Sequence, residues 1–577
     1  KDKLLTGKTW VIGGRWRWCV PRMMMRGDRV GPHGIRGCGR GAHTGCVRIT
    51  HGTHASAGTA GTAGTTATGG GPVGNGINPY TGKEQTFQHI LDTSRRLAVY
   101  LQREGLKAND TIAVCSENNL EFCIPVCAAF YLGAIACPLN PLYSERELKH
   151  ALSISKPKYI FISTVSLNGI RKIFRELHWL PKILMLTDGR NNVSWTSMYK
   201  VISNVSSDDA NALQAAPVNL DDHVTAILCS SGTTGLPKGV MLMDKNITTV
   251  IRIYMNTNTI PENRISLSLL PFFHAYSFVL MVLSILNGNC SIVFSRFEEE
   301  LFLKCIEKYR IEYMPMVPSL MVFLAKHPLV DKYDLSCVKT IWSGAAPLSK
   351  EIQQAVAKRL NMNIIDVKQG YGLTETTLAV LQSPDGKGKL GSVGVVVPGT
   401  LAKIIPIGEY ETDKTLGPNC KGELCFKGDL IMKGYYNDEK STRATIDKDG
   451  WLHTGDVGYY DEDGYFYIVD RIKELIKYKG YQVPPAELEA ILLTFPGIQD
   501  AAVIGISNDK TGELPMAFIV KEENSNICEK DIIQYVNERV SNPKRLRGGI
   551  RFVDSIPKTP SGKILRRVLR DKLKSKL

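Results

Sequence analysis

The chain has 577 residues, of which 43% are hydrophobic and 22% charged, and it carries a formal net charge of +15 at pH 7. These proportions are ordinary for a globular protein with a large core and exclude the fibrous and the wholly disordered classes. The first 76 residues hold eleven Lys and Arg against two Asp, so the rest of the chain is only mildly basic and does not indicate a nucleic-acid partner.

Residues 1–76 differ in composition and patterning from the rest of the chain. They contain 19 of the 52 glycines and the low-complexity run TAGTAGTTATGGG, with neither a helical nor a strand period. Such sequence buries too little apolar surface to offset its ordering entropy, so we expect a disordered leader. The leader also holds the four histidines His33, His43, His51 and His54, with Cys38 and Cys46 near them. Their spacing matches no metal-ligand pattern.

From residue 77 onward, apolar runs alternate with amphipathic stretches. Residues 87–106 have helical spacing, TIAVCS (111–116) predicts a buried strand, and residues 120–140 predict a helix that leads into another strand. The same order repeats through KYIFIS, KILML, VTAILC, CSIVF and KTIWSG. This alternation favours parallel sheets covered by helices, with ligands at the carboxyl ends of the strands.

The fourteen cysteines lack the paired short spacings of a zinc site. Four of them, Cys115, Cys123, Cys127 and Cys137, lie in apolar runs. We therefore expect buried free thiols and a reducing compartment.

The strand VTAILC is followed by SSGTTGLPKGV, residues 230–240. Its glycines let backbone N–H groups turn toward an anion, its hydroxyls add donors, and Lys238 supplies positive charge, a combination that indicates a phosphate site. It is not a Walker A loop, because Gly239 stands where that motif needs a hydroxyl. A flexible turn uses the same residue types, so composition alone leaves both interpretations open.

The most hydrophobic window, residues 267–286, approaches the length of a membrane span. It contains Pro271, His274 and several aromatic residues. We therefore expect a buried strand, a loop and a buried helix, and no membrane span.

Two later stretches carry polar side chains. In QGYGLTETT (369–377) an aromatic residue between glycines can stack on a base, and Thr374 and Glu375 offer a hydroxyl and a carboxylate suited to Mg²⁺; a polar turn is the alternative. In GWLHTGD (450–456) we place Asp456 on a turn after an exposed Trp-Leu-His run, where it can accept ribose hydroxyls. The alternative there is a hairpin turn, such as the one that DEDG (461–464) predicts.

The pattern changes after the charged junction at residues 470–473. Residues 485–493, then DAAVIGI, PMAFIV, EKDIIQYVNERV and IRFVD, predict a helix, two strands, a helix and a strand, which together make a compact α+β unit. Near the end, PKTPSGKILRR (557–567) places Lys563 on a Pro/Gly/Ser loop, and a mobile cation there can neutralise charge that develops in a transition state. Taken alone, Lys563 is one basic residue among many.

The last three residues, SKL (575–577), form the tripeptide that the peroxisomal import receptor binds at a true carboxyl terminus. A basic tail that ends in Leu by chance is the alternative. We expect the receptor as a partner and the peroxisome as the location.

Together, SSGTTGLPKGV, YGLTET, GWLHTGD, VDRIKELIKYKGYQVPPAELE and PKTPSGK resemble the adenylate-forming superfamily of acyl-CoA synthetases, coumarate-CoA ligase-like enzymes and beetle luciferases. The resemblance covers residues 77–577, and FEEELFLKCIEKY, DKYDLS and APLSKE are similar to the luciferase branch. It implies an α/β fold. Residues 77–469 would form a large domain of parallel-rich sheets covered by helices, with a barrel-like part. A hinge at 470–473 would lead to a small mobile α+β domain over 474–577.

The resemblance also implies a reaction with ATP, Mg²⁺ and coenzyme A. A carboxylate attacks the α-phosphorus of ATP to give an acyl-adenylate and pyrophosphate; the small domain then rotates, and the thiol of coenzyme A displaces AMP. By the same resemblance, the β- and γ-phosphates would be held by Ser230, Ser231, Gly232, Thr233, Thr234, Gly235 and Lys238.

Further roles follow from the same match. Tyr371, beside Gly372, would stack on adenine, Thr374 would contact the α-phosphate, and Glu375 would bind Mg²⁺. Asp456 would bind the ribose hydroxyls, with Arg471 nearby.

Two parts of the small domain would serve the two half-reactions. Lys563 would bridge the carboxylate and the α-phosphate during adenylation. Lys477 and Gly480 would belong to the face that is presented for thioester formation.

The acyl pocket would be lined by His274, Tyr276 and Gly344, although without the resemblance His274 is a core histidine. Luciferases have a serine after GLTETT, where this chain has Leu378, and their ASGG is WSGA here, with Trp342 and Ala345. An added indole removes room for a fused bicyclic substrate and favours an aliphatic acid.

We therefore predict a non-luminescent fatty acyl-CoA synthetase that acts as a monomer. A luciferase-type monooxygenase that oxidises a luciferyl-adenylate is one alternative. A truncated, catalytically defective ATP-binding product is another, because the family carries further residues of its first sub-domain ahead of NPYTGKEQTF, and the leader does not resemble them.

Overall fold

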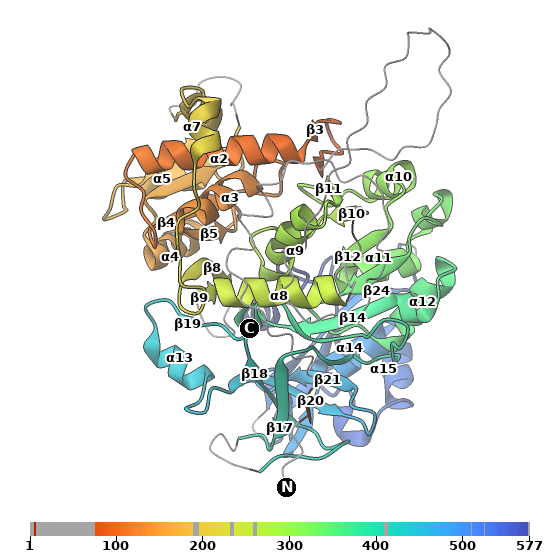
Figure 1. The fold of residues 1–577 in the computed structure, drawn as a ribbon. Helices are drawn as coiled ribbons and strands as arrows, with labels where there is room; N and C mark the ends of the chain where they lie inside the picture. Colours follow the sequence, from red (N-terminus) through yellow and green to blue (C-terminus); the bar gives the residue numbers. More distant parts are fainter. Residues whose placement is uncertain are drawn as a thin grey trace, which may run out of the picture.

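The computed structural model describes residues 76–187, 195–230, 236–257, 262, 264–408, 414–508, 510–523 and 525–574, together with the backbone of residues 5–6. In Figure 1 the elements coloured orange to yellow lie at the upper left, the green elements at the right, and the teal and blue elements below them. The expected disorder of the leader and the SKL tripeptide both fall outside the described residues, apart from the short strand β1 (Leu5–Thr6).

A seven-stranded sheet forms the first layer, with strand order β19-β9-β8-β5-β4-β6-β7. Its strands β4 to β8 pair in parallel, and β9 and β19 add antiparallel pairs. The strands are β4 (Thr111–Cys115), β5 (Ile135–Leu139), β6 (Tyr159–Ile162), β7 (Lys182–Met185), β8 (Val224–Ser230), β9 (Lys238–Met243) and β19 (Gly434–Tyr435). Because strand side chains alternate in direction, Val114 joins a central core and Cys115 an outer one.

A nine-stranded sheet forms the second layer, in the order β16-β15-β14-β13-β12-β10-β11-β2-β3. Pairing is parallel from β14 to β2 and antiparallel at both edges. The strands are β2 (Gly76–Ile77), β3 (Glu84–Gln85), β10 (Ile265–Ser268), β11 (Cys290–Val293), β12 (Tyr313–Met316), β13 (Thr340–Ser343), β14 (Val367–Gly372), β15 (Ala379–Gln382) and β16 (Val395–Val396). Along β13, Ile341 packs in the outer core and Trp342 in the central core.

Helices cover both sheets. The central core receives α2 (Phe87–Arg103), α3 (Cys123–Leu132), α8 (Asp244–Asn256) and α9 (Ala275–Leu286). The outer cores receive α4 (Glu145–Ser155) and α5 (Leu167–Phe174) on the first sheet, and α10 (Glu299–Tyr309), α11 (Pro318–Lys326) and α12 (Lys350–Arg359) on the second. Shorter helical segments are α6 (Met198–Ile202), α7 (Ser207–Ala212), η1 (Pro328–Lys332) and η2 (Ile364–Asp366). The predicted helix-covered, parallel-rich sheets are thus confirmed.

The hydrophobic window at residues 267–286 folds as predicted into part of β10, a loop and α9. The side chains of α9 are largely buried in the central core. Within the described residues, no helix has the length and apolar character that crossing a membrane requires. The four cysteines expected as buried thiols, Cys115, Cys123, Cys127 and Cys137, are free and buried.

An antiparallel sheet lies below these layers in Figure 1, in the order β1-β17-β18-β20-β21. It comprises β17 (Thr400–Ile405), β18 (Gly422–Gly428), β20 (Leu452–Tyr460) and β21 (Phe466–Arg471), besides β1, and α13 (Glu439–Thr445) lies between β19 and β20 in the chain. This sheet is the part of the large domain that we compare with the expected barrel-like part. Among the described residues its pairings run in an open order from β1 to β21.

The structure corrects the expected surroundings of Asp456. It lies inside β20, not on a turn, and is 6% exposed. Trp451 and Leu452, which we expected to be exposed, are buried. The reason is that β20 pairs with β18 on one side and β21 on the other, so its apolar side chains join the cores of the sheet.

The last part of the chain has its own small cores. It contains β22 (Ile476–Tyr478), β23 (Tyr481–Val483), α14 (Pro485–Leu492), β24 (Ile498–Asn508), β25 (Gly512–Lys521), α15 (Glu529–Asn537), η4 (Asn542–Lys544), β26 (Ile550–Phe552) and α16 (Arg566–Lys574). This confirms an α+β unit. It contacts the large domain where Lys326 of α11 donates from Nζ to the carbonyl oxygen of Ile498, over 2.7 Å.

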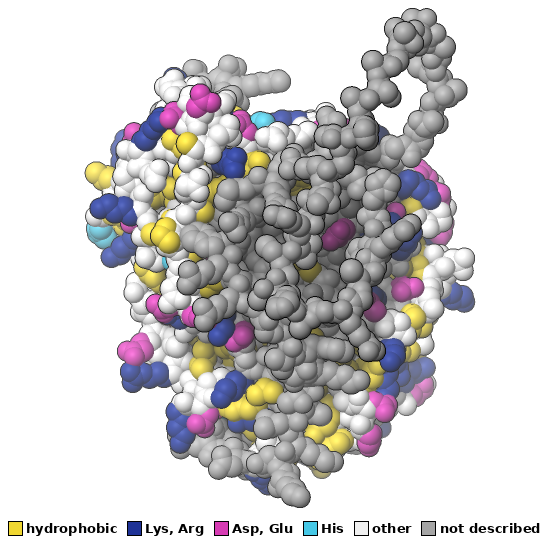
Figure 2. Space-filling view, viewed as in Figure 1, with side chains coloured by type: hydrophobic (Ala, Val, Ile, Leu, Met, Phe, Trp, Pro, Cys, Tyr) yellow, Lys and Arg dark blue, Asp and Glu magenta, His cyan; other side chains and the backbone are white. Residues whose placement is uncertain are grey.

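Charged side chains of both signs lie around the rim of the face that Figure 2 shows. Figure 2 shows Lys and Arg side chains interspersed with Asp and Glu around the rim of one face, with hydrophobic side chains between them. Exposed ion pairs, such as Lys149 with Glu176 at 2.7 Å, also bring opposite charges together. Charge of mixed sign does not create the extended positive field that attracts a polyanion.

Candidate active site

Glu375 ties the two helix-covered sheets together. It lies in the short helix η3 (Thr374–Thr376), directly after β14. Its Oε1 accepts hydrogen bonds from the hydroxyl of Ser230 at 2.8 Å and from that of Tyr435 at 2.9 Å. Ser230 ends β8 and Tyr435 lies on β19, so one carboxylate oxygen joins both strands to η3.

Tyr435 was not anticipated from the sequence. Burial, followed by the nearby charge of Glu375, raises the pKa of its hydroxyl, which therefore stays a hydrogen-bond donor. Lys238, the first residue of β9, has its Nζ 4.8 Å from the centre of the Tyr435 ring and donates to Ser441 Oγ at 2.7 Å. The stretch KGYYND gave no sign of this role, because the role of Tyr435 depends on contacts with residues far away in the chain.

The glycine- and hydroxyl-rich loop is described only at its two ends. Ser230 and Lys238 pair across β8 and β9, and both turn to the site around Glu375. The other predicted loop residues, Ser231, Gly232, Thr233, Thr234 and Gly235, lie outside the described residues.

Asp456 is the centre of a second group. The Tyr371 hydroxyl donates to its Oδ2 at 2.7 Å, and Arg471 Nε lies 3.6 Å from its Oδ1. Asp456 and Arg471 face each other because β20 and β21 pair at these two positions. Burial raises the pKa of the Asp456 carboxyl, while the charge of Arg471 and the Tyr371 hydrogen bond oppose that rise.

Lys563 comes to both groups from the small domain. Burial, with the charge of Arg471, lowers its pKa to about 8, and the negative charges of Asp456 and Glu375 act in the opposite direction. Its backbone N–H donates to Thr559 Oγ1 at 3.0 Å, which fixes the loop ahead of α16. The ammonium group is thus within electrostatic reach of both carboxylates.

A glycine lets this loop approach the large domain. Gly562 has a φ of +80°, and a Cβ there would lie 3.3 Å from Ser319 Oγ and 3.4 Å from Val317 Cγ2. A larger residue would therefore meet strain and a tight contact at once.

His274 lies beside the Lys563 loop, just before α9. Burial and, secondarily, the charge of Lys563 lower the pKa of its imidazole to about 4, so the ring is neutral at pH 7. Its Nε2 is buried and makes no hydrogen bond within the described part of the chain. A bound polar group could form the missing hydrogen bond. A histidine with only a packing role would normally have this nitrogen bonded within the protein.

The other predicted pocket residues meet where α9 and β13 face each other. The Tyr276 hydroxyl donates to the carbonyl oxygen of Trp342 at 3.2 Å, and a Cβ on Gly344 would lie 3.4 Å from the Tyr276 ring. Trp342 is 5% exposed and Leu378 6% exposed. Together they form a close-packed, largely apolar wall.

Two backbone positions in this region are strained or tight. Ala345 has a φ of +71°, in the left-handed region that favours glycine. At Gly372 a Cβ would lie 1.9 Å from the carbonyl oxygen of Leu378, so only glycine fits.

Comparison with known proteins agrees with this geometry. The family model of the AMP-binding enzymes matches residues 66–436, and that of the AMP-binding enzyme C-terminal domain matches residues 487–563. The chain belongs to the AMP-binding enzyme family. This confirms the adenylate-forming superfamily inferred from the motifs, and the first match begins inside the Gly-rich leader.

Relatives of this AMP-binding enzyme differ in their named activities. It is 45% identical to the luciferin 4-monooxygenase of Photuris pensylvanica, over 87% of this chain and 92% of that protein. It is 39% identical to the probable 4-coumarate–CoA ligase 1 of Dictyostelium discoideum, over 86% and 91%. Among solved structures, ATP-bound MatB from Rhodopseudomonas palustris is 26% identical with a TM-score of 0.76, over 85% and 94%.

Not every predicted residue joins the two groups in this AMP-binding enzyme. Lys477 lies exposed on β22, where its backbone N–H donates to Glu513 Oε2 at 2.8 Å, and none of its described contacts reaches Glu375 or Asp456. Gly480, at a φ of +80°, lies on the turn between β22 and β23. Thr374 lies next to Glu375 in η3.

Proposed function

We propose that the protein is an acid–CoA ligase that makes an acyl-CoA from a carboxylic acid, ATP and coenzyme A by way of an acyl-adenylate. The observation that carries the proposal is the convergence of Lys563, from the small domain, on Glu375 and Asp456 of the large domain. A buried cation that interacts with two carboxylates suits a reaction in which an anionic acid must approach an anionic phosphate.

In the first half-reaction, an oxygen of the substrate carboxylate bonds to the α-phosphorus while the bond to the β-phosphate breaks and pyrophosphate leaves. In the second, the sulfur of coenzyme A bonds to the acyl carbon, AMP leaves, and the thiol proton passes to solvent. Relatives named as coumarate–CoA ligases support the second step.

Nucleotide binding would use both groups of the site. Lys238 and Ser230 would contact the pyrophosphate side, Tyr371 would pack against the adenine, and Asp456 would accept the ribose hydroxyls. Glu375, with hydroxyl oxygens around it, offers the oxygen ligands that Mg²⁺ takes. When bound, Mg²⁺ would neutralise charge on the phosphates.

Lys563 would hold the attacking carboxylate and the α-phosphate together. As an ammonium it lessens the repulsion between two anions, and its burial makes each such interaction stronger than it would be in water. His274, neutral at pH 7, would border the carboxylate end of the acyl pocket as a hydrogen-bonding group.

The acid that we propose is aliphatic, such as a fatty acid. Support comes from the apolar wall around Trp342 and Leu378, in which an indole occupies space that an aromatic bicycle would need. Fatty acids and aryl acids then differ mainly in shape, and the shape of the pocket determines which of them the protein accepts.

A panel of carboxylic acids tests this substrate class. Purified protein is given ATP, Mg²⁺ and coenzyme A, and the release of pyrophosphate and AMP is measured for straight-chain acids, coumarate and benzoate. We expect the highest kcat/KM with a straight-chain acid, and Trp342→Ala should shift the preference toward aryl acids. Higher kcat/KM with coumarate in the wild type would refute the aliphatic assignment while leaving the ligase proposal intact.

A luciferin-oxidising activity is a second candidate, because relatives 45% and 44% identical are named luciferin 4-monooxygenases. The protein would then emit light with ATP, Mg²⁺, O₂ and luciferin. Light well above background, with no coenzyme A-dependent AMP formation from any acid in the panel, would favour this candidate. The opposite result favours the ligase.

A further inference from the structure

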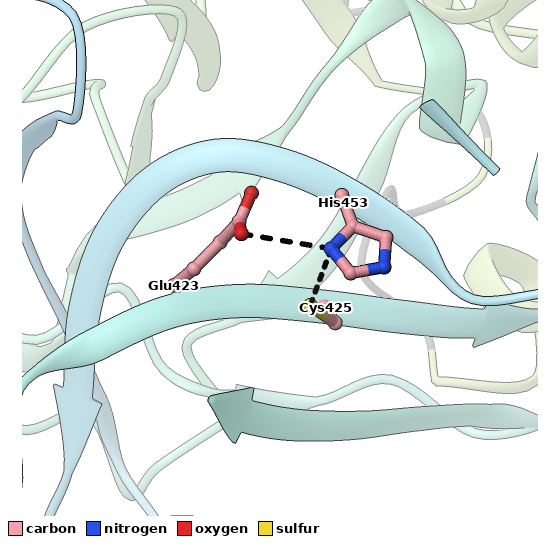
Figure 3. Close-up of side chains that lie close together, drawn as sticks. All are labelled: Glu423, Cys425 and His453. Atoms are coloured by element: carbon pink, nitrogen blue, oxygen red, sulfur yellow. Dashed lines mark hydrogen bonds and ion pairs between the residues drawn. The ribbon is translucent and has the colours of Figure 1, made fainter. Parts of the chain in front are cut away.

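A group of metal-binding side chains lies outside the proposed active site, in the antiparallel sheet. Glu423 and Cys425 come from β18 and His453 from β20, and Cys425 pairs directly with His453 in the register of the two strands. One ligand atom from each of the three residues lies within 4.8 Å of the others. Figure 3 shows the carboxylate and the thiol both directed at the same ring nitrogen.

Glu423 leaves one of its oxygens unsatisfied. The residue is 1% exposed, and its Oε1 accepts the backbone N–H of Gly455 at 2.9 Å. Its Oε2 accepts no hydrogen bond from any residue that the structure describes, and it points toward His453 (Figure 3). A buried carboxylate oxygen that accepts no hydrogen bond is costly, and its ion pair with His453 Nδ1, at 3.5 Å, is longer than a hydrogen bond. A bound cation would compensate the charge of this oxygen more fully.

His453 cannot satisfy both neighbours through one proton. Its Nδ1 lies 3.6 Å from Cys425 Sγ and 3.5 Å from Glu423 Oε2. A single ring nitrogen carries at most one proton, which can be shared with only one of the two. A metal ion between the three atoms would bind all of them.

Two of the three ligand separations suit zinc. With Zn–S near 2.3 Å and Zn–N or Zn–O near 2.0 to 2.1 Å, tetrahedral ligands lie about 3.4 to 3.6 Å apart. The two ligand separations at His453 have these lengths. A thiolate and a carboxylate also balance the two positive charges of Zn²⁺, which reduces the cost of a buried ion.

A fourth residue orients the histidine. Asp447 Oδ2 lies 3.3 Å from Nε2 of His453, opposite the nitrogen that faces the thiol. Metal-bound histidines commonly donate their other N–H to a carboxylate in this way. The same contact leaves Nδ1 as the ring nitrogen that faces Cys425 and Glu423.

We propose that Glu423, Cys425 and His453 form a Zn²⁺ site in which Asp447 is a positioning residue and water completes the tetrahedron. Binding replaces the Cys425 thiol proton, which passes to solvent, and forms bonds to sulfur, nitrogen and oxygen without any change of oxidation state. The site adjoins the proposed nucleotide site, because Gly455, which donates its backbone N–H to Glu423, directly precedes Asp456 in β20.

Co²⁺ is the first probe, because a thiolate ligand gives it a sulfur-to-metal absorption band. Full-length protein, freed of metal by a chelator, is titrated with Co²⁺ and then with Zn²⁺. We expect a band that saturates with a single equivalent of Co²⁺ and disappears when Zn²⁺ displaces it. A folded wild-type protein that gives no band would overturn the proposal and leave a metal-free, hydrogen-bonded group.

Variants locate the bound ion. Glu423→Gln keeps the acceptor for Gly455 but removes the charge, and it should weaken Zn²⁺ binding at least about tenfold, as measured by competition with a zinc-binding dye. Cys425→Ser should abolish the sulfur-to-metal band. Asp447→Asn should weaken binding by about ten- to a hundredfold while keeping the band.

Matched controls exclude other thiols. Cys420 and Cys528 are exposed, so Cys420→Ser/Cys528→Ser should leave the band and the Zn²⁺ affinity unchanged. Cys19→Ser/Cys38→Ser/Cys46→Ser, in the Gly-rich leader, should do the same. A band that survives Cys425→Ser but is lost in either control variant would place the ion elsewhere and overturn the proposal.

Thermal melting separates lost binding from lost folding. Zn²⁺ should raise the Tm of the wild type, because an ion that binds only the folded state stabilises it. Glu423→Gln should melt cooperatively and show no such rise. An equal rise in Tm for this variant and the wild type would also overturn the proposal.

Discussion

Adenylation should lose rate at alkaline pH because Lys563 loses its proton there. Burial and the charge of Arg471 bring the pKa of this lysine from an ordinary 10.5 to about 8. About nine-tenths of the lysine is then charged at pH 7 and about one-tenth at pH 9. If the transition state needs the ammonium, kcat/KM should fall about tenfold for each pH unit above 8.

The assay is pyrophosphate release at limiting ATP between pH 6.5 and 9.5 (about three units), because kcat/KM reports groups of the free enzyme. Lys563→Arg provides the matched control, since a guanidinium keeps its charge over this range. It should retain part of the activity and lose the alkaline fall. If Lys563→Arg shows the same alkaline fall as the wild type, another group is responsible and the reasoning is refuted.

The two half-reactions give a second check on the same residue. Lys563→Ala should slow adenylation by about a hundredfold or more, a typical loss for one charge-stabilising group. Thioester formation from supplied acyl-adenylate should be nearly unchanged. An equal loss in both half-reactions would contradict the assigned role.

The same pKa shift has the opposite effect on stability. Between about pH 8 and 10.5, the unfolded chain holds a proton on Lys563 that the folded chain has released. Stability rises with pH wherever the unfolded state binds more protons. This group should therefore contribute an increase in the free energy of unfolding across that window, which Lys563→Ala would remove in denaturation experiments.

Three further substitutions test packing and backbone strain by the free energy of unfolding. Arg566 donates two hydrogen bonds to the buried Glu489, at 2.7 and 2.8 Å. Arg566→Met should therefore cost about 3 to 5 kcal/mol, and the double variant Arg566→Met/Glu489→Leu should recover part of that loss. A double variant less stable than the single one would contradict this. Ala345→Gly should gain about 0.5 to 1 kcal/mol by relieving the φ of +71°, whereas no gain would mean that the strain is small. Gly372→Ala should cost more than about 3 kcal/mol, because its Cβ would lie 1.9 Å from a carbonyl oxygen, while Gly370→Ala, with its nearest atom at 3.5 Å, should cost little.

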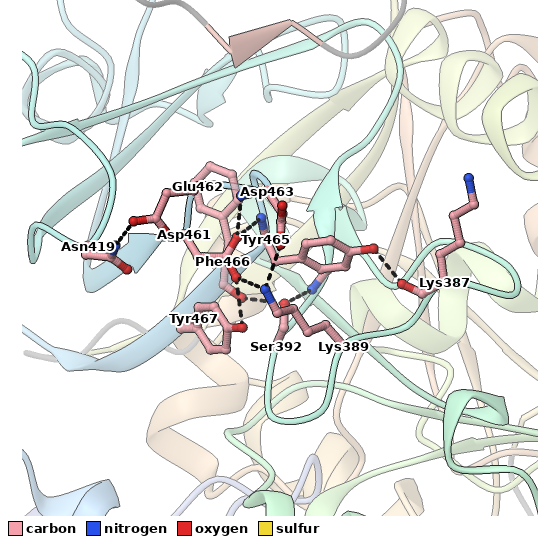
Figure 4. Close-up of polar contacts among 11 residues, drawn as sticks. Lys387, Lys389, Ser392, Asn419, Asp461, Glu462, Asp463, Tyr465, Phe466 and Tyr467 are labelled. Carbon is pink, nitrogen blue, oxygen red and sulfur yellow. Dashed lines mark hydrogen bonds and ion pairs between the residues drawn. The ribbon is translucent and has the colours of Figure 1, made fainter.

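Local turn chemistry could be predicted well from the sequence. DEDG predicts the hairpin that the structure shows between β20 and β21, with Asp461 accepting the backbone N–H groups of Asp463 and Tyr465. What the turn does beyond the hairpin was not predictable. Figure 4 shows Lys389, far away in the chain, bonded to both Asp461 and Asp463.

In the candidate site, too, local motifs could be predicted from the sequence and contacts between distant segments could not. The motifs predicted Glu375, Asp456 and Lys563, because each lies in a short stretch with a characteristic pattern. They did not predict Tyr435, which matters only because β19 runs beside β9, or the burial of Asp456, which follows from its place between two other strands. Contacts between distant segments leave no local pattern.

The hydrogen bond between Tyr371 and Asp456 has a consequence for nucleotide selectivity. The carboxylate already accepts the Tyr371 hydrogen bond at 2.7 Å and faces Arg471. In the proposed function, an arriving ribose would therefore exchange one set of hydrogen bonds for another and gain little net free energy from them. Discrimination between sugars would then come from a sugar that cannot replace every hydrogen bond that Asp456 loses. If Asp456 binds the ribose as proposed, a 2′- or 3′-deoxy nucleotide that displaces the tyrosine would leave a buried charge short of a donor. We therefore expect the site to select ribonucleotides by this penalty.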